Sequence, residues 1–173
     1  MTRFAKFLKD ERGSSTIEFV LLFPAFVVVM LSAVESGIFM IRSVMLERGV
    51  DLAVRELRLG INVPSDEQEL ITMVCNHSAF LQRCPEIMRL ELVQIDMATW
   101  NFPSTAATCT ISDELLQPEL GYTVGVDHNL MLLRVCAVMN PWFPSTGIGL
   151  GLPKNEAGLY SLTAASAFVV EPS

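Results

Sequence analysis

Apolar residues dominate the first part of the chain without a regular spacing. Residues 19–34, sixteen in all, carry no formal charge, and a short interruption at residues 35–37 separates them from four more apolar residues ending at Ile41. A helix needs about 20 apolar residues to cross the hydrocarbon core of a bilayer. The pattern therefore predicts a membrane-spanning helix over residues 14–41.

Beyond Arg42 the apolar positions become periodic. They recur at helical spacing on one face, at Leu46, Val50, Ala53 and Leu57. No helix breaker occurs before Gly60, a residue type that commonly ends helices. We therefore expect the first helix to continue to about Leu59, as a rod of about 45 residues and about 68 Å, with residues 42–60 outside the membrane.

The remaining residues, 61–173, show shorter patterns. Ser65–Leu81 starts with an N-cap followed by acids and predicts a second helix. Residues 101–127 predict mainly loop with a helical turn at 113–116, and residues 141–153 contain too many Pro and Gly for a regular element. Three stretches predict strands, namely Ile87–Trp100, Asn129–Met139 and Leu159–Val170. The expected fold is α+β: a long N-terminal helix and a second helix packed on a small three-stranded antiparallel sheet.

Charge separates the two ends of the chain. Residues 1–13 carry four basic and two acidic residues, whereas the residues after Arg42 carry 7 basic and 15 acidic ones, in a chain of net charge −7. An excess of Lys and Arg keeps one flank of a spanning helix in the cytoplasm, so we expect the acidic part on the other side. The acidic balance also argues against nucleic acid as a partner, because phosphate binding requires basic groups.

Small residues lie on the unusual side of the apolar run. An ordinary signal peptide is cut after its apolar region, at an A-x-A-like site, but Ser32-Ala33-Val34 has a bulky Val at the last small position. Gly13 and Ser14 precede the run, where only a protease at the cytoplasmic face would cut. Residues 1–13 are therefore predicted to be a leader, and the helix is predicted to remain in the mature protein.

Three segments together resemble one bacterial family. They are Gly13 to Pro24 with Glu18-Phe19, then Glu35-Ser36-Gly37-Ile38-Phe39, and then Ala53-Val54-Arg55-Glu56. These segments are similar to those of TadE-like minor pilins, or pseudopilins, of bacterial tight-adherence (Flp-type) pili, and Gly13 followed by Glu18 resembles a prepilin-peptidase site. The resemblance implies a pilin-like fold and cleavage between Gly13 and Ser14.

Glu18 would become the fifth residue of the cleaved chain. A carboxylate inside a membrane costs about 2.5–3.5 kcal/mol on insertion scales, which makes it a functional candidate. Its expected partner is the free amine of Ser14 on a neighbouring subunit. The alternative is a capping box over Ser15-Thr16-Ile17-Glu18, in which Glu18 only satisfies backbone donors at the helix start.

Phe19, Pro24 and Glu35 are further candidates for helix contacts during assembly. Pro24 removes a backbone hydrogen bond, either to soften the helix for its exit from the bilayer or as a harmless kink. Glu35 lies near the outer end of the span, where it pairs either locally, with Arg42 close by, or with the helix of another subunit.

All four cysteines follow the predicted span. An even number on the oxidising side of a membrane predicts two disulfides. Three connectivities are possible, and we favour Cys75 with Cys84 and Cys109 with Cys136. Cys75, His77 and Cys84 are an alternative set of zinc ligands, but their spacing is not a usual zinc spacing, so we expect neither metal nor cofactor.

The chain shows little sign of catalysis. It has two histidines and lacks a nucleophile elbow, a P-loop and a dinucleotide-binding glycine motif. The resemblance implies a structural subunit instead, a minor pilin that acts in initiation or at the tip of a tight-adherence pilus and in adhesion. The implied partners are prepilin peptidase, another minor pilin, the major pilin and the inner-membrane pilus assembly platform.

The implied location is the bacterial inner membrane, crossed once. The N-terminus would be cytoplasmic and the α+β domain, residues 61–173, periplasmic, before any incorporation into a pilus. One alternative is a permanently anchored periplasmic binding or chaperone-like domain, for which Gly13 is incidental. A type II secretion pseudopilin is the other.

Overall fold

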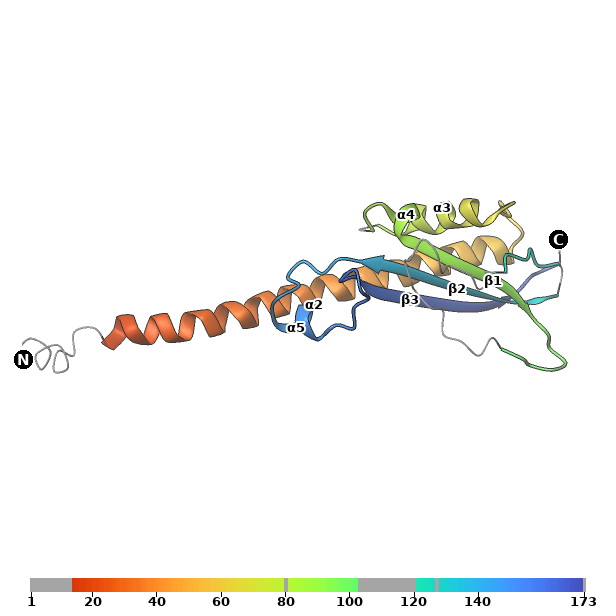
Figure 1. The fold of residues 1–173 in the computed structure, drawn as a ribbon. Coiled ribbons are helices and arrows are strands. Elements are labelled where there is room, and N and C mark those ends of the chain that lie inside the picture. Colours follow the sequence, from red (N-terminus) through yellow and green to blue (C-terminus); the bar gives the residue numbers. More distant parts are fainter. Residues whose placement is uncertain (1–13, 80, 103–120, 127, 173) are drawn as a thin grey trace, which may run out of the picture.

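The computed structural model describes residues 14–79, 81–102, 121–126 and 128–172. One long helix comes first, and the strands follow two shorter helices (Figure 1). The elements in chain order are α2 (Ser14–Arg58), α3 (Glu67–His77), α4 (Cys84–Ile87), β1 (Met88–Ile95), β2 (Leu130–Met139), α5 (Gly147–Gly151) and β3 (Tyr160–Val169).

Helix α2 forms the rod that the apolar pattern predicts. It contains 45 residues, which corresponds to about 68 Å at 1.5 Å per residue. Pro24 lies inside the helix. The first part of α2 projects beyond the rest of the protein, and the second part lies along the sheet (Figure 1).

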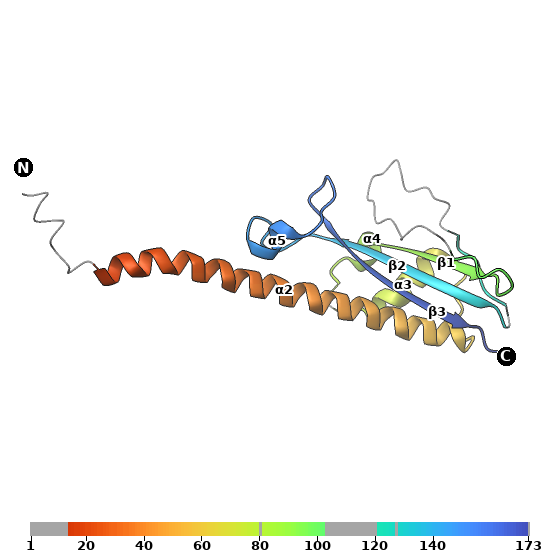
Figure 2. The same cartoon turned by 90° about the horizontal axis from the view of Figure 1, so that it is seen from below.

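The three strands form one antiparallel sheet in the order β1-β2-β3, which confirms the expected α+β class. At one end of the sheet Met139 lies opposite Tyr160, and the chain passes from there into α5. At the other end Leu130 lies opposite both Ile95 and Val169. Figure 2 shows that the first of these ends, here called the α5 end, faces the projecting part of α2.

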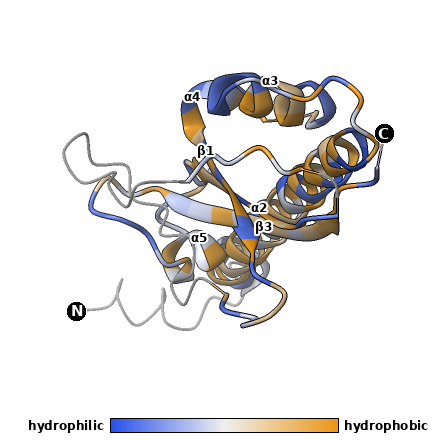
Figure 3. Cartoon of the chain, turned by 90° about the vertical axis from the view of Figure 1, so that its right-hand side faces the viewer, coloured by the Kyte–Doolittle hydropathy of each residue, from blue (hydrophilic) through white to orange (hydrophobic). Residues whose placement is uncertain are grey.

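One face of the sheet is covered by α2 and α3, which contact β3 and β1 respectively. Figure 3 shows the two helices side by side on this face, with apolar residues toward the sheet. The expected α2 face is confirmed, because its four periodic residues are all buried. They pack with apolar residues of α3 and of all three strands in a single core: Leu46, Val50, Ala53, Leu57, Leu70, Ile71, Val74, Leu90, Leu92, Met131, Leu133, Val135, Tyr160, Leu162 and Phe168.

Two elements are shorter than expected. Strand β1 ends at Ile95 rather than Trp100, because the Asp96 carboxylate accepts hydrogen bonds from the Ala98 N–H (2.9 Å) and the Thr99 hydroxyl (3.0 Å) and turns the chain. The same two hydrogen bonds lower the pKa of Asp96.

Helix α3 ends at His77 rather than Leu81. The Ser78 hydroxyl donates to the Val74 carbonyl at 2.8 Å, and the Ser78 N–H donates to the Cys75 carbonyl at 3.1 Å. These bonds satisfy two carbonyls at the helix end, which is the usual requirement at a helix terminus.

Residues 141–153 were expected to lack regular structure, and this expectation is wrong. They contain the short helix α5, Gly147–Gly151. Tertiary contacts with α2, described below, position this segment. The helical turn expected at 113–116 lies outside the described residues.

Candidate functional site along the N-terminal helix

The N-terminal turns of α2 carry the residues expected to act in processing and assembly. Gly13 lies outside the described residues, and α2 begins at Ser14. Glu18 and Phe19 are exposed. Since Ser15 lies inside α2, it is not at the N-cap, and the described residues show no capping-box hydrogen bond to the Glu18 carboxylate. Glu18 is thus displayed on the surface of the projecting helix.

The projecting part of α2 is apolar and uncovered. Its most apolar stretch of 18 residues has no buried share, and it is the one helix among the described residues that is long and apolar enough to cross a membrane. The rings of Phe19 and Phe23 stack one turn apart, with centroids 5.0 Å from each other. This surface is compatible with single-pass membrane anchoring.

Glu35 is fully buried, although it is acidic. One of its carboxylate oxygens accepts hydrogen bonds from the backbone N–H groups of Trp142 (3.0 Å) and Phe143 (2.9 Å), and the other lies 3.1 Å from the Trp142 nitrogen. Hydrogen bonds to an ionised acceptor are among the stronger ones in proteins. The partner of Glu35 is therefore the loop after β2 in the same chain.

Arg42 contacts the same loop from the next turns of α2. Its guanidinium donates to the Asn140 carbonyl at 3.1 Å and to the Tyr160 hydroxyl at 2.7 Å. Arg42 therefore binds the α5 end of the sheet rather than Glu35, which was its expected local partner. Tyr160 also packs on Phe39 of α2, with ring centroids 5.6 Å apart.

Glycines let the loop approach α2 closely. Gly147 has φ +45°, and a Cβ at this position would lie 1.6 Å from the Ser32 hydroxyl oxygen. A Cβ on Gly149 would lie 2.1 Å from the Phe143 carbonyl oxygen. Both positions therefore require glycine, for backbone conformation at the first and for space at both.

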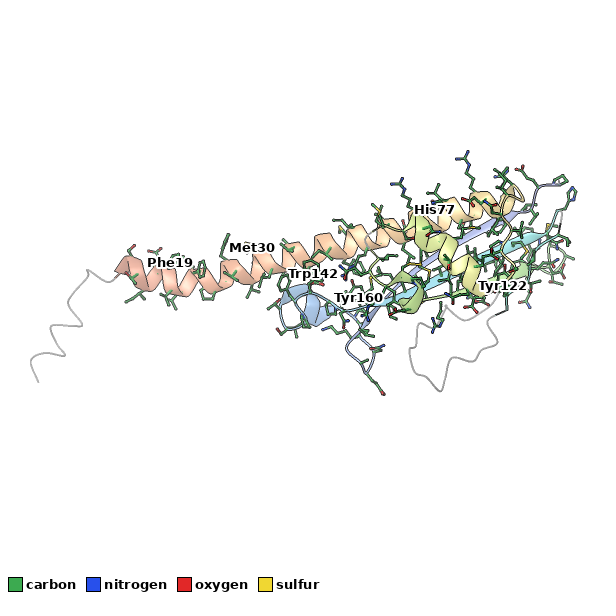
Figure 4. The ribbon with its side chains drawn as sticks, turned by 90° about the horizontal axis from the view of Figure 1, so that it is seen from above. Phe19, Met30, His77, Tyr122, Trp142 and Tyr160 are labelled. Atoms are coloured by element: carbon green, nitrogen blue, oxygen red, sulfur yellow. A yellow bond between two sulfur atoms is a disulfide. The ribbon has the colours of Figure 1, made fainter. Side chains whose placement is uncertain are left out.

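We call residues 141–152 and the α2 residues that they contact, Ser32 and Glu35, the α5 collar. Figure 4 shows Trp142 near α5, between Met30 on the projecting helix and Tyr160 on the sheet. The sequence identified Glu35 as a candidate but not its partner. The partner consists of backbone N–H groups, and no residue type shows which N–H groups will bind a carboxylate. One sequence feature could have indicated this loop as the partner, because none of residues 141–152 is charged although the domain is strongly acidic.

The cysteines stabilise the region away from the projecting helix. Cys75 and Cys84 form a disulfide that joins the end of α3 to α4, the pairing favoured from the sequence. Cys136 is disulfide-bonded as well, and its expected partner, Cys109, lies outside the described residues. His77 lies 3.1 Å from the Glu56 carboxylate, and the described residues contain no cluster of His, Cys, Asp and Glu suited to a metal ion.

Tyr122 ties the residues beside β1 to the start of α3. Its hydroxyl donates to the Pro64 carbonyl at 2.6 Å, and its backbone lies in a parallel bridge with Leu92. Burial raises the pKa of Tyr122, and the nearby carboxylates of Asp66 and Glu69 raise it further.

The chain combines a long apolar helix, half projecting and half packed, with a small antiparallel sheet, which is an α+β arrangement. The family model described as TadE-like protein matches residues 13–55, which confirms the TadE-like resemblance over nearly all of α2. The match indicates a protein associated with the Tad pilus. No curated protein and no solved structure matches the chain.

Proposed function

We propose that this protein is a minor pilin, or pseudopilin, of a tight-adherence pilus, and that it acts as a structural subunit in pilus initiation or in a tip complex and contributes to adhesion. It is inserted into the bacterial inner membrane with its N-terminus in the cytoplasm and the α+β domain in the periplasm. Prepilin peptidase then cuts between Gly13 and Ser14. The assembly platform transfers the subunit to a filament that contains another minor pilin and the major pilin.

One coincidence carries this proposal. The family match covers residues 13–55, and the part of α2 that the fold leaves uncovered lies within that range. A helix half that is apolar and unpaired in the isolated subunit needs another apolar environment, which is first lipid and later the helices of neighbouring subunits. A pilus subunit uses both environments in turn.

In this transfer, Glu18 provides a polar contact between neighbouring subunits. Its exposed side chain lies on the apolar projecting helix, where a charge is costly once the helix is in a membrane. Cleavage after Gly13 creates a positive amine on Ser14, and an opposite charge nearby offsets that cost strongly in a medium of low polarity. The amine of one subunit would therefore select the Glu18 of its neighbour and fix the axial position of the incoming helix.

The N-terminal residue of the membrane-extracted protein tests processing. We expect a chain that starts at Ser14 in cells containing the peptidase, and a chain that retains the leader when Gly13→Arg is introduced. A side chain at Gly13 crowds the extended backbone that a peptidase must bind. Thr2→Arg adds the same charge elsewhere in the leader and is the matched control.

A wild-type protein that keeps residues 1–13 in such cells contradicts the proposal. So does a Gly13→Arg variant that stays unprocessed yet supports pilus formation fully. The second result is the outcome expected of a permanently anchored periplasmic domain. A protein processed at Ser14 that copurifies with a type II secretion system instead of Tad pilus subunits would assign it to that system.

A further inference from the structure

We propose that the α5 collar rests in the interfacial layer of the membrane, where it seats the domain on the bilayer and marks the outer end of the span at about Ser32. This inference rests on the single membrane crossing in the proposed function, but not on pilus assembly. It concerns a surface far from the processing site.

Helix length sets the position of the collar. From Ser14 to Ser32 the helix rises by about 27 Å at 1.5 Å per residue, and the hydrocarbon core of a bilayer is about 30 Å thick. A helix whose first residue lies at one boundary therefore brings Ser32 to the other. A Cβ on Gly147 would touch Ser32, so α5 reaches that boundary together with the helix.

The surface of the collar fits this depth. Trp142, Ile148 and Leu150 are exposed, and none of residues 141–152 is charged. Tryptophan is enriched at the boundary between hydrocarbon and water, because its ring is apolar and its N–H remains near polar groups. Lys154 lies two residues after the collar and donates to the Pro144 carbonyl at 3.1 Å.

The free face of α2 continues the same surface. Val34, Met40, Ile41 and Val44 are exposed beside the collar. Arg42 is half-buried in this part of the helix, where its guanidinium donates to Asn140 and Tyr160, and the next charged residues, Glu47 and Arg48, are exposed. Apart from Arg42, the exposed residues of the collar and of this face are uncharged.

Glu35 is the one acidic residue at this level, and its burial removes the main objection to contact with lipid. Its carboxylate accepts hydrogen bonds from the N–H groups of Trp142 and Phe143, so the charge is shielded from the bilayer. The same bonds satisfy two backbone donors that would otherwise be costly at the edge of the hydrocarbon. The hydrogen bonds between the loop and Glu35 therefore lower the cost of placing both at this depth.

The bilayer fits this surface better than a single protein partner does. The collar is continuous with the uncovered apolar part of α2, and its exposed apolar groups lie on the loop as well as on the free face of the helix. A layer that surrounds the rod contacts both at once. A neighbouring helix would cover one side only.

Two tryptophans allow a matched experiment. Trp142 is 59 % exposed and Trp100 is 60 % exposed, but Trp100 follows the Ile95 end of β1, at the far end of the sheet from α5. Trp100→Phe leaves Trp142 as the single tryptophan, and Trp142→Phe leaves Trp100. Each full-length variant is reconstituted in phosphatidylcholine vesicles with or without bromine on the upper acyl carbons, and fluorescence is quenched separately with aqueous iodide.

We expect brominated lipid to quench Trp142 and not Trp100, and iodide to quench Trp142 several-fold less than Trp100. Equal quenching of both residues by iodide, in protein that resists alkaline extraction from the vesicles, overturns the collar proposal and leaves the membrane crossing intact. Protein that is extracted by alkali overturns the crossing itself, and the proposed function with it. Protection of Trp142 from iodide without lipid quenching shows that another copy covers it, and this also overturns the proposal.

A charge placed in the collar gives a second measurement. Leu150 is 65 % exposed in the collar, and Val126 is 67 % exposed near the far end of the sheet. In the variant whose single tryptophan is Trp142, Leu150→Glu should increase iodide quenching several-fold, because a carboxylate draws the loop toward water, whereas Val126→Glu should leave it unchanged. Equal effects of the two substitutions contradict the proposal.

Discussion

At the scale of single residues, Glu35 shows how an acid in an apolar segment can be structural. From the sequence, Glu35 is a candidate for contact with the helix of another subunit. In the structure, both of its carboxylate oxygens instead accept hydrogen bonds from the loop after β2. Glu18 differs, since it stays exposed near the start of the same helix. The two acids of the apolar segment therefore have different surroundings, one bonded inside the fold and one exposed on its surface.

Glu35→Ala should release the loop. Two part-buried N–H groups lose their acceptor, which costs about 1–3 kcal/mol and makes local amide exchange roughly fivefold to 150-fold faster. Hydrogen exchange followed by mass spectrometry of peptides covering residues 141–152, in detergent, measures the change. Glu35→Gln keeps one carbonyl oxygen as acceptor and should fall in between, and Glu47→Ala, an exposed acid of the same helix, is the control. Unchanged exchange in Glu35→Ala would show that the hydrogen bonds do not hold the loop.

Tyr122 should titrate above its ordinary pKa of 10.0, because burial and the charges of Asp66 and Glu69 favour the neutral phenol. The folded state then holds the proton more tightly than the unfolded state. Its contribution to stability is complete below pH 10 and is lost as the pH rises through the folded pKa. Since the chain has two tyrosines, ultraviolet titration of Tyr160→Phe reports Tyr122 alone. A midpoint at or below 10.0, with circular dichroism still native, contradicts the assignment.

At the scale of elements, the sequence predicted the parts whose patterns are long and uniform. Helix α2 was found almost to the residue, because its apolar and periodic segments extend over many turns. Elsewhere, local side-chain hydrogen bonds end an element earlier than its apolar pattern predicts. Asp96 ends β1 in this way, and Ser78 ends α3. Helix α5 was missed because nothing local favours it. Its position depends on Ser32 and Glu35, more than 100 residues away.

The contact between α2 and α3 depends on a single glycine. Gly49 is buried, and a Cβ there would lie 1.8 Å from the Ser78 hydroxyl oxygen and 2.8 Å from the Val74 carbonyl oxygen. Gly49→Ala should therefore destabilise the domain by about 1–3 kcal/mol, measured by thermal unfolding in detergent. Gly37 lies in the same helix, where an added Cβ would meet nothing within 4 Å, and Gly37→Ala should be neutral or stabilising by up to about 1 kcal/mol. An equal loss of stability in both variants would contradict the assignment of the effect to the close contact of Gly49 with Val74 and Ser78.

At the scale of the whole molecule, the two halves of α2 have different surroundings. Its second half is integrated into a core with the sheet and α3, while the most apolar stretch of the helix has no buried share. The domain therefore folds around one end of a helix whose other end it leaves uncovered. The candidate residues on the projecting half were identified from the sequence, but one chain by itself does not show what they contact.

Glu18→Ala should block filament assembly while leaving insertion and folding unchanged. The side chain is exposed on the projecting part of α2, so its loss removes only the proposed contact with the Ser14 amine of a neighbour. Electron microscopy counts pili, and membrane fractionation checks insertion. Glu47→Ala serves again as the control on the same helix. Normal numbers of pili with Glu18→Ala would rule out this contact.

The connection between Glu35 and the loop has a mechanical consequence. Tension applied to the domain and resisted at the projecting end of α2 passes between the two, and the contacts nearest that end are Gly147 against Ser32 and the hydrogen bonds of Glu35. These would yield before the apolar core is strained. Under pulling, the loop could peel from the rod and re-form, while the sheet and the second half of the helix stayed folded.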